Sequence, residues 1–138
     1  MNKLTYEQWL TALCLWREAR NQLPTCIRAV KAVIINRTRD PQRRWPNDPI
    51  AVILQPKQFS SFNAGTLQMF PNPSDQTTLD WTVWNLCQQI VLEPIPGQPD
   101  ALMLNGINAY ESVADTKERP AWAKNPEMEI GDIRFYKL

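Results

Sequence analysis

Histidine is absent from this sequence of 138 residues. Catalysis by a Ser-His-Asp or Cys-His arrangement needs an imidazole base, and zinc peptidases and zinc amidases usually need at least one imidazole ligand. None of these sites can be assembled here. If the protein is an enzyme without a bound cofactor, carboxylates are therefore its expected acid-base groups.

Cysteine is scarce, and its three positions are Cys14, Cys26 and Cys87. They lack the close C-x-x-C spacing of a metal or redox site, and an odd number argues against a complete set of disulfides. We expect reduced and mostly buried thiols. The sequence thus predicts neither a metal site nor a cofactor.

Long apolar runs are also missing. No run reaches the roughly 18 residues of a transmembrane helix, and the segment from Met1 to Thr5 lacks the apolar core and cleavage site of a secretory signal. We therefore expect synthesis in the cytoplasm without a cleavable signal, and no membrane insertion. The length favours a single domain over residues 1–138.

The net charge is small, because 15 basic and 14 acidic side chains give a formal charge of +1. Such a balance creates no overall field that would attract nucleic acid, so nucleic acid is not an expected partner. Locally, the segment 28–44 is basic and could contact phosphate or another anionic polymer. The alternative is a solvated helix end. The basic residues of this segment are Arg28, Lys31, Arg37, Arg39, Arg43 and Arg44, and its acid is Asp40.

A helix is predicted from Tyr6 to about Arg20, because Thr5 and Gln8 form a capping-box pattern. Apolar residues cover most sides of this helix, so it belongs in the interior. Glu18 then lies near the end of a buried helix, where desolvation favours the protonated form that a general acid needs. An ion pair between Glu18 and a nearby arginine is the alternative.

The remaining pattern predicts helices over residues 26–37, 50–54 and 75–92, and short extended elements over 107–113 and 130–138. Turns are indicated at Asn105-Gly106 and Gly131-Asp132. The fold class is α+β and predominantly α, with a central buried helix and small β elements in the C-terminal half. The core stripe expected in the last helix is Leu79, Val83, Leu86, Cys87 and Ile90, with Trp81 and Trp84 to one side.

Tryptophan is abundant, with six in the chain. Trp9 and Trp16 fit the core stripe of the first helix. Trp45 and Trp122 stand in proline-containing loops, where aromatic rings can line a groove for sugars.

A series of short motifs runs along the chain: Glu18-Ala19-Arg20, Val33-Ile34-Ile35-Asn36-Arg37, Gln58-Phe59-Ser60, Pro120-Ala121-Trp122, and Ile130-Gly131 with Phe135-Tyr136. In this order and spacing they resemble the SleB/CwlJ family of cell wall hydrolases. The resemblance covers most of the chain, from about Leu10 to Tyr136. It implies a peptidoglycan-cleaving enzyme, a glycosidase in the broad sense, with a lysozyme-like, helix-rich fold.

The resemblance also implies roles for individual residues. In that family the glutamate at the position of Glu18 is the catalytic acid. The spore-cortex members act as lytic transglycosylases that cut between N-acetylmuramic acid and N-acetylglucosamine and leave a 1,6-anhydro product. Asn36 and Arg37 are expected to fix the second helix against the first. The substrate-binding residues expected beside Glu18 are Gln58, Phe59, Ser60, Tyr110 and Trp122, of which Phe59 could stack on a sugar or simply anchor its loop.

The sequence departs from the family pattern in two informative places. Relatives usually read Glu-Ala-Arg-Gly-Glu, whereas Asn21-Gln22 follow the arginine here, and a common Tyr-His pair is replaced by Tyr110-Glu111. Glu111 could be a second carboxylate in the cleft, which would favour muramidase-type hydrolysis over transglycosylation. The alternative is an exposed glutamate with no role in the reaction.

The leading hypothesis is a monomeric, bacteriolytic endolysin of phage type that acts on the glycan strands of peptidoglycan. It would reach the bacterial cell wall in the periplasm after release or delivery by another protein. A virion or secretion-apparatus component is an alternative setting. Two other function classes stay open: a non-catalytic peptidoglycan-binding or structural module, and a nucleic-acid-binding protein that uses the 28–44 segment.

Overall fold

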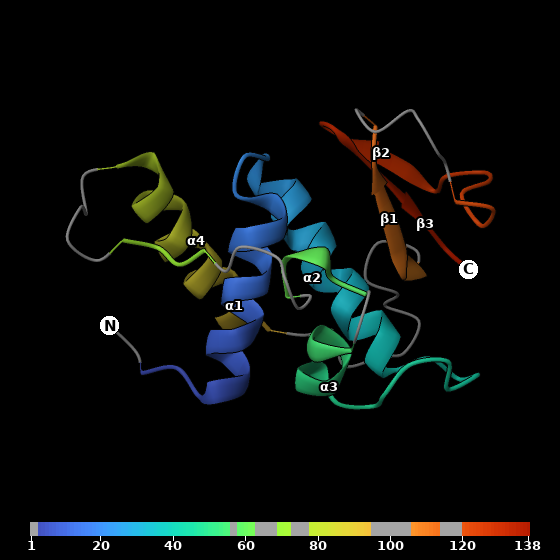
Figure 1. Ribbon diagram of the computed structural model, residues 1–138, viewed down its shortest axis with the longest axis horizontal. Helices are drawn as coiled ribbons and strands as arrows, with labels where there is room; N and C mark the ends of the chain where they lie inside the picture. The colour runs from blue at the N-terminus through green and yellow to red at the C-terminus, as the bar shows by residue number, and fades with distance from the viewer. Residues whose placement is uncertain (1–2, 56–57, 63–68, 73–77, 95–105, 114–119) are drawn as a thin grey trace.

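The computed structural model describes residues 3–55, 58–62, 69–72, 78–94, 106–113 and 120–138. Figure 1 shows helix α1 between α4 and α2, with a small sheet on the far side of α2. The predicted α+β class, with a central helix and with strands in the second half, is confirmed. The elements are α1 (Tyr6–Ala19), α2 (Pro24–Thr38), α3 (Pro49–Leu54), the 3-10 turn η1 (Ser60–Phe62), α4 (Leu79–Leu92), β1 (Ala109–Ser112), β2 (Met128–Ile130) and β3 (Ile133–Tyr136).

Helix α1 is the central element of the core. Its predicted capping box is present: the backbone N–H of Gln8 donates to Oγ1 of Thr5, and the backbone N–H of Thr5 donates to Oε1 of Gln8. Every residue from Leu10 to Trp16 is buried, because the helix packs against α2, α3 and α4. A helix with apolar residues all round requires such neighbours.

Helix α2 begins earlier than the sequence predicts, because Pro24 occupies its first turn, where a missing N–H costs nothing. Near its other end, the amide of Asn36 donates to the carbonyl of Ile107 at 2.8 Å, and Nε of Arg37 donates to the carbonyl of Asn108 at 2.7 Å. These two residues therefore join α2 to the segment before β1. The expectation that they fix α2 against α1 is corrected accordingly.

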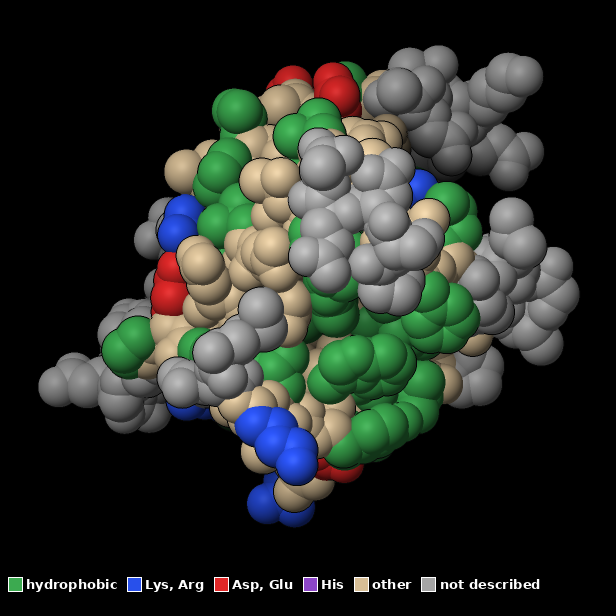
Figure 2. All heavy atoms as spheres, turned by 90° about the vertical axis from the view of Figure 1, so that its left-hand side faces the viewer, with side chains coloured by type: hydrophobic (Ala, Val, Ile, Leu, Met, Phe, Trp, Pro, Cys, Tyr) green, Lys and Arg blue, Asp and Glu red, His purple; other side chains and the backbone are tan. Residues whose placement is uncertain are grey.

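The start of α4 differs from the prediction. Thr78 caps the helix, so Leu79 lies in the exposed first turn with 76% of its surface accessible. Trp84 is buried instead, on the same face as Cys87, three residues later. The predicted residues 75–77 lie outside the described part of the chain. Hydrophobic side chains also remain exposed on the α4 side of the molecule (Figure 2). In α4 itself, Leu79 and Leu92 are exposed.

The sheet has two different faces. Its order is β1-β3-β2, with antiparallel neighbours, and Tyr110 of β1 lies opposite Phe135 of β3. Both rings belong to the core formed with the helices. Glu111 and Arg134 form the next pair and point to the opposite face, because side chains alternate along a strand. Gly131, with φ of 57°, occupies the turn between β2 and β3 that the sequence indicates.

The three cysteines are free and buried, as predicted. Among the described residues, no helix has the length and apolar character that crossing a membrane requires.

Candidate active site

Glu18 lies in the last turn of α1 and is half-buried. Its Oε1 accepts a hydrogen bond of 2.5 Å from the hydroxyl of Tyr110 on β1. Within the described part of the chain, Glu18 makes no ion pair, and its Oε2 makes no hydrogen bond. The neighbouring cations bind elsewhere: Arg17 donates to the carbonyl of Met69, and Arg20 lies 3.9 Å from Asp80. One oxygen of Glu18 is thus fixed and the other is left for a ligand.

Tyr110 is held by aromatic neighbours. Its ring centroid lies 5.9 Å from that of Phe135 and 6.4 Å from that of Phe59. Burial, together with the charge of Glu18, raises the pKa of Tyr110 well above its usual value, although Arg37 acts in the opposite direction. The hydroxyl therefore keeps its proton at neutral pH and stays a donor to Glu18.

On the core side of α1, the neighbour of Glu18 one turn earlier is an uncharged thiol. This residue, Cys14, is fully buried. Burial and the charge of Glu18 raise the pKa of the Cys14 thiol well above its usual value, so the thiol stays neutral. Cys14 therefore adds no charge beside the carboxyl group of Glu18.

Arg37 supplies a buried positive charge near the hydrogen-bonded pair of Glu18 and Tyr110. Its side chain is only 7% exposed, and its guanidinium lies over the rings of Trp45 and Phe59, 5.1 and 5.2 Å from their centroids. Burial lowers the pKa of Arg37, while the negative forms of nearby groups, Glu18 among them, raise it. An arginine remains charged under such shifts, so the site has a fixed cation.

The Gln58-Phe59-Ser60 motif lies beside these groups. Oε1 of Gln58 accepts from Nη1 of Arg37 at 3.4 Å and from the indole N–H of Trp45 at 3.3 Å. Phe59 is fully buried beneath Tyr110, which is the anchoring role rather than an exposed stacking surface. Ser60 begins η1, and its side chain lies outside what the structure describes.

Two predicted site residues are not brought together with Glu18. Glu111 points to the opposite face of the sheet from Tyr110, and its carboxylate accepts a hydrogen bond from the hydroxyl of Tyr136. Trp122 is 39% exposed and packs edge-on against Tyr136, with ring centroids 5.3 Å apart. Both therefore belong to the sheet face that turns away from Glu18.

The structure adds Arg37 to the site, and the sequence did contain a signal for it. Val30, Val33, Ile34 and Arg37 follow helical spacing, so the arginine continues the buried stripe of α2. A charged residue at such a position must find partners in the interior. Among the described residues, no group of three or more Cys, Asp and Glu side chains could hold a metal ion.

The model of the family described as Cell Wall Hydrolase matches residues 25–136. The chain belongs to this family. Membership confirms the resemblance found from the motifs and the expectation of an enzyme. The matched segment begins after α1, so it does not include Glu18.

Two solved structures share the fold of this cell wall hydrolase over 99% of its chain. One is the catalytic domain of the germination-specific lytic transglycosylase SleB from Bacillus anthracis, with a TM-score of 0.66, 20% identity and 99% of that chain covered. The other is the catalytic domain of the Bacillus cereus SleB protein, with a TM-score of 0.65, 21% identity and 94% of that chain covered. No match was found among curated proteins.

Proposed function

We propose that the protein cleaves the glycan strands of peptidoglycan between N-acetylmuramic acid and N-acetylglucosamine, as a lytic transglycosylase with Glu18 as its acid and base. The observation that carries this proposal is the hydrogen bond from Tyr110 to one carboxyl oxygen of Glu18, with the other oxygen left without a partner among the described residues. The fold shared with a SleB catalytic domain described as a lytic transglycosylase supports the same reaction.

The reaction begins with protonated Glu18. Its acidic oxygen gives a proton to the glycosidic oxygen while the bond from that oxygen to C1 of the muramic acid breaks. The C6 hydroxyl oxygen of the same sugar then bonds to C1, and its proton passes to the carboxylate of Glu18. The products are a free 4-hydroxyl on one fragment and a 1,6-anhydro end on the other. Glu18 returns to its starting form and no water is consumed.

One carboxylate suffices for this chemistry because the substrate supplies its own nucleophile. A hydrolase instead places a second carboxyl group about 5 to 9.5 Å from the first, as nucleophile or as the base for water. Glu111 was the candidate for that role, and its carboxylate lies on the other sheet face with Tyr136. The placement of Glu111 favours transglycosylation over muramidase-type hydrolysis.

Substrate contacts are assigned to polar groups of the Gln58-Phe59-Ser60 motif, whose Phe59 lies near Tyr110, the partner of Glu18. With Oε1 of Gln58 engaged by Arg37 and Trp45, the NH₂ of its amide is the part directed to sugar hydroxyl or acetamido groups. Ser60 remains a predicted contact of the same kind. We expect the protein to act at the bacterial cell wall as one monomeric catalytic domain, with delivery as a phage-type lysin as the proposed setting.

The decisive experiment is digestion of purified sacculi, followed by mass spectrometry of the fragments. The wild-type protein is expected to clear the sacculi and leave fragment ends one water lighter than hydrolytic ends. Glu18→Gln, which keeps the size of the side chain and its ability to accept from Tyr110, is expected to abolish clearing with an unchanged circular dichroism spectrum. Equal clearing by this variant would remove Glu18 from the mechanism, and hydrolytic ends would reverse the assignment of the reaction.

A further inference from the structure

The proposed reaction does not use the basic segment 28–44 as a unit. In the structure, the cations of this segment fall into two groups. Four of them have hydrogen-bond or ion-pair partners inside the protein. Arg28 binds Glu93 at 2.8 Å, Lys31 donates to the carbonyls of Ile90 and Glu93, Arg37 donates to Asn108, and Arg44 binds Asp40 at 2.8 Å. Arg39, which also has an interaction partner, and Arg43 are both exposed and line a pocket.

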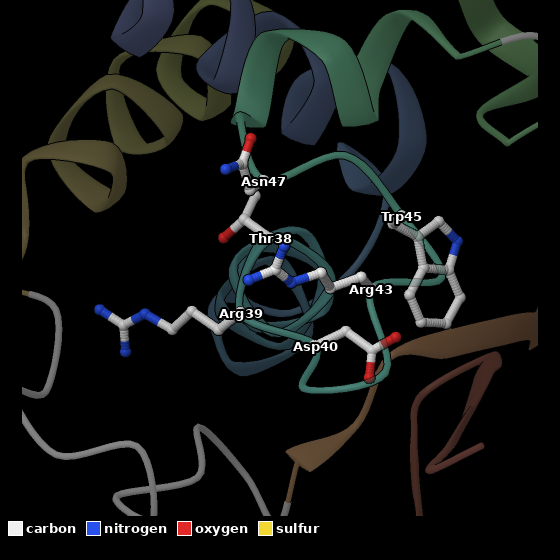
Figure 3. Close-up of a pocket in the computed structure, with 6 residues that line it drawn as sticks. All are labelled: Thr38, Arg39, Asp40, Arg43, Trp45 and Asn47. Carbon is white, nitrogen blue, oxygen red and sulfur yellow. The ribbon is translucent and has the colours of Figure 1, made fainter.

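This pocket has a volume of about 390 Å³ and lies at the C-terminal end of α2 (Figure 3). In the view of Figure 3, the side chain of Arg43 extends across the end of α2 toward Thr38 and Asn47, while the ring of Trp45 stands on the opposite side. A guanidinium, a hydroxyl, an amide and an aromatic ring thus surround one cavity. The lining residues are Thr38, Arg39, Asp40, Arg43, Trp45 and Asn47.

The acid of the pocket does not neutralise Arg43. The carboxylate of Asp40 accepts from Nε and Nη2 of Arg44, and also from the backbone N–H groups of Gln42 and Arg44. The carboxylate of Asp40 is therefore occupied by Arg44 and by the backbone, and not by Arg43. Within the described part of the chain, Arg43 makes no ion pair and no hydrogen bond through its side chain. An uncompensated guanidinium at a cavity is suited to an anion.

The backbone at Arg43 is an independent sign of a role beyond the turn. Its φ is 53°, in the left-handed region, where glycine or asparagine is accommodated more easily than a long side chain. Strained residues of this kind concentrate at binding and catalytic sites. Glycine or asparagine would form this turn with less backbone strain. The presence of arginine therefore indicates a role for its side chain.

We propose that this pocket binds a carboxylate of the peptides that branch from the glycan strands, an assignment that rests on the proposed function. A guanidinium matches the two oxygens of a carboxylate. The Thr38 hydroxyl already donates to Ile35, which leaves its oxygen to accept from a peptide N–H. Trp45 forms a wall of the pocket, and its indole N–H binds Gln58 of the candidate active site. The peptide pocket and the glycan site thus share one tryptophan.

The first test measures binding and does not depend on cleavage. The full chain is titrated with a soluble N-acetylmuramoyl peptide that has free carboxylates, and with the same peptide after its carboxylates are amidated. Arg43→Asn is the variant of choice, because asparagine tolerates the left-handed backbone while removing the guanidinium. Its Kd for the free peptide is expected to rise about tenfold, the usual scale for a charge-assisted hydrogen bond. Amidation is expected to weaken binding to the wild-type protein to the same extent.

Two further variants complete this test. Arg43→Lys retains the charge but not the planar fork, and an intermediate Kd is expected. Lys124→Ala removes an exposed cation elsewhere and should leave the Kd unchanged. Equal Kd values for the wild type and Arg43→Asn would overturn the proposal. Tighter binding of poly(glycerol phosphate) than of the peptide would also overturn it, because the pocket would then be a phosphate site.

The second test compares cleavage of glycan strands that carry peptides with strands from which an amidase has removed them. The wild-type protein should prefer the peptide-bearing strands in kcat/KM, and Arg43→Asn should lose most of that preference. An undiminished preference in the variant would contradict the proposal. If the wild-type protein cleaves neither substrate, the proposed function fails, and the binding constants still decide what the pocket holds.

Discussion

The hydroxyl of Tyr110 lies 2.5 Å from Oε1 of Glu18 and joins strand β1 to the last turn of α1, across 92 residues of sequence. The tyrosine is oriented by Phe135 of β3 and by Phe59 of the loop before η1. Three segments that are distant in the sequence thus fix one oxygen of one carboxyl group. A general acid must be held in this way, because small displacements of a reacting group strongly reduce the rate.

The first prediction concerns Tyr110→Phe. This variant keeps the ring packing but removes the donor to Glu18, so kcat on peptidoglycan is expected to fall about 10- to 100-fold, with little change in KM. Steady-state turbidity assays on sacculi measure both constants. Tyr136→Phe is the matched control, because its hydroxyl donates to Glu111 on the opposite face of the sheet. A Tyr110→Phe variant as active as this control would exclude a positioning role for the hydroxyl.

The second prediction concerns Glu111. If a single carboxylate performs the reaction, Glu111→Gln keeps activity within about a factor of three, and its fragments still end in 1,6-anhydro sugars. The amide oxygen of the new side chain can still accept from Tyr136, so the sheet should be little affected. Turbidity and fragment masses are measured together. A loss of activity comparable to that of Glu18→Gln would instead indicate a two-carboxylate hydrolase.

The third prediction concerns the buried guanidinium of Arg37. Arg37→Met retains apolar packing against Trp45 and Phe59 but leaves the carbonyl of Asn108 without its donor. The free energy of unfolding is expected to fall by about 2–3 kcal/mol, as measured by urea denaturation. Arg28→Met is the control: its pair with Glu93 is solvent-exposed and should contribute about 1 kcal/mol or less. Equal losses would show that burial of Arg37 adds nothing to its contribution.

Local patterns predicted the elements well, since each depends on neighbours in sequence. The capping box at Thr5 is present as expected, and the free thiols are buried. The errors arose where the start of a helix decides which side chains face the core. The exposed Leu79 and buried Trp84 of α4 follow from a start at Leu79 rather than at residue 75.

The site was harder to predict from the sequence. It depends on which face of the strand each side chain occupies, and on packing between residues that are distant in the sequence. Tyr110 and Glu111 are adjacent, and the sequence alone cannot decide which of them faces the helices. The register of β1 with β3 decides it, by placing Tyr110 opposite Phe135. The surroundings of Arg37 could not be predicted from the sequence either, because its partners Gln58 and Asn108 lie 21 and 71 residues away in the chain.

The last prediction is a dependence of stability on pH at the loop beside α2. The pKa of Asp40 is lowered to about 2, first by the side-chain hydrogen bond from Arg44 and then by backbone N–H groups of the loop. A carboxyl group in the unfolded chain titrates near 3.9. Because the folded pKa is the lower one, Asp40 stabilises the fold above about pH 4, and this contribution disappears as the pH falls toward 2.

Asp40→Asn measures this contribution directly. At pH 6 the variant is expected to be less stable than the wild type by about 2 kcal/mol, since one pKa unit corresponds to about 1.4 kcal/mol. The difference between the two proteins should shrink when the urea denaturations are repeated near pH 2. Glu129→Gln, which breaks the more exposed pair with Arg134, serves as the control and should change stability by less than about 1 kcal/mol. A difference for Asp40→Asn that is independent of pH would mean that the carboxylate charge is not what holds this loop.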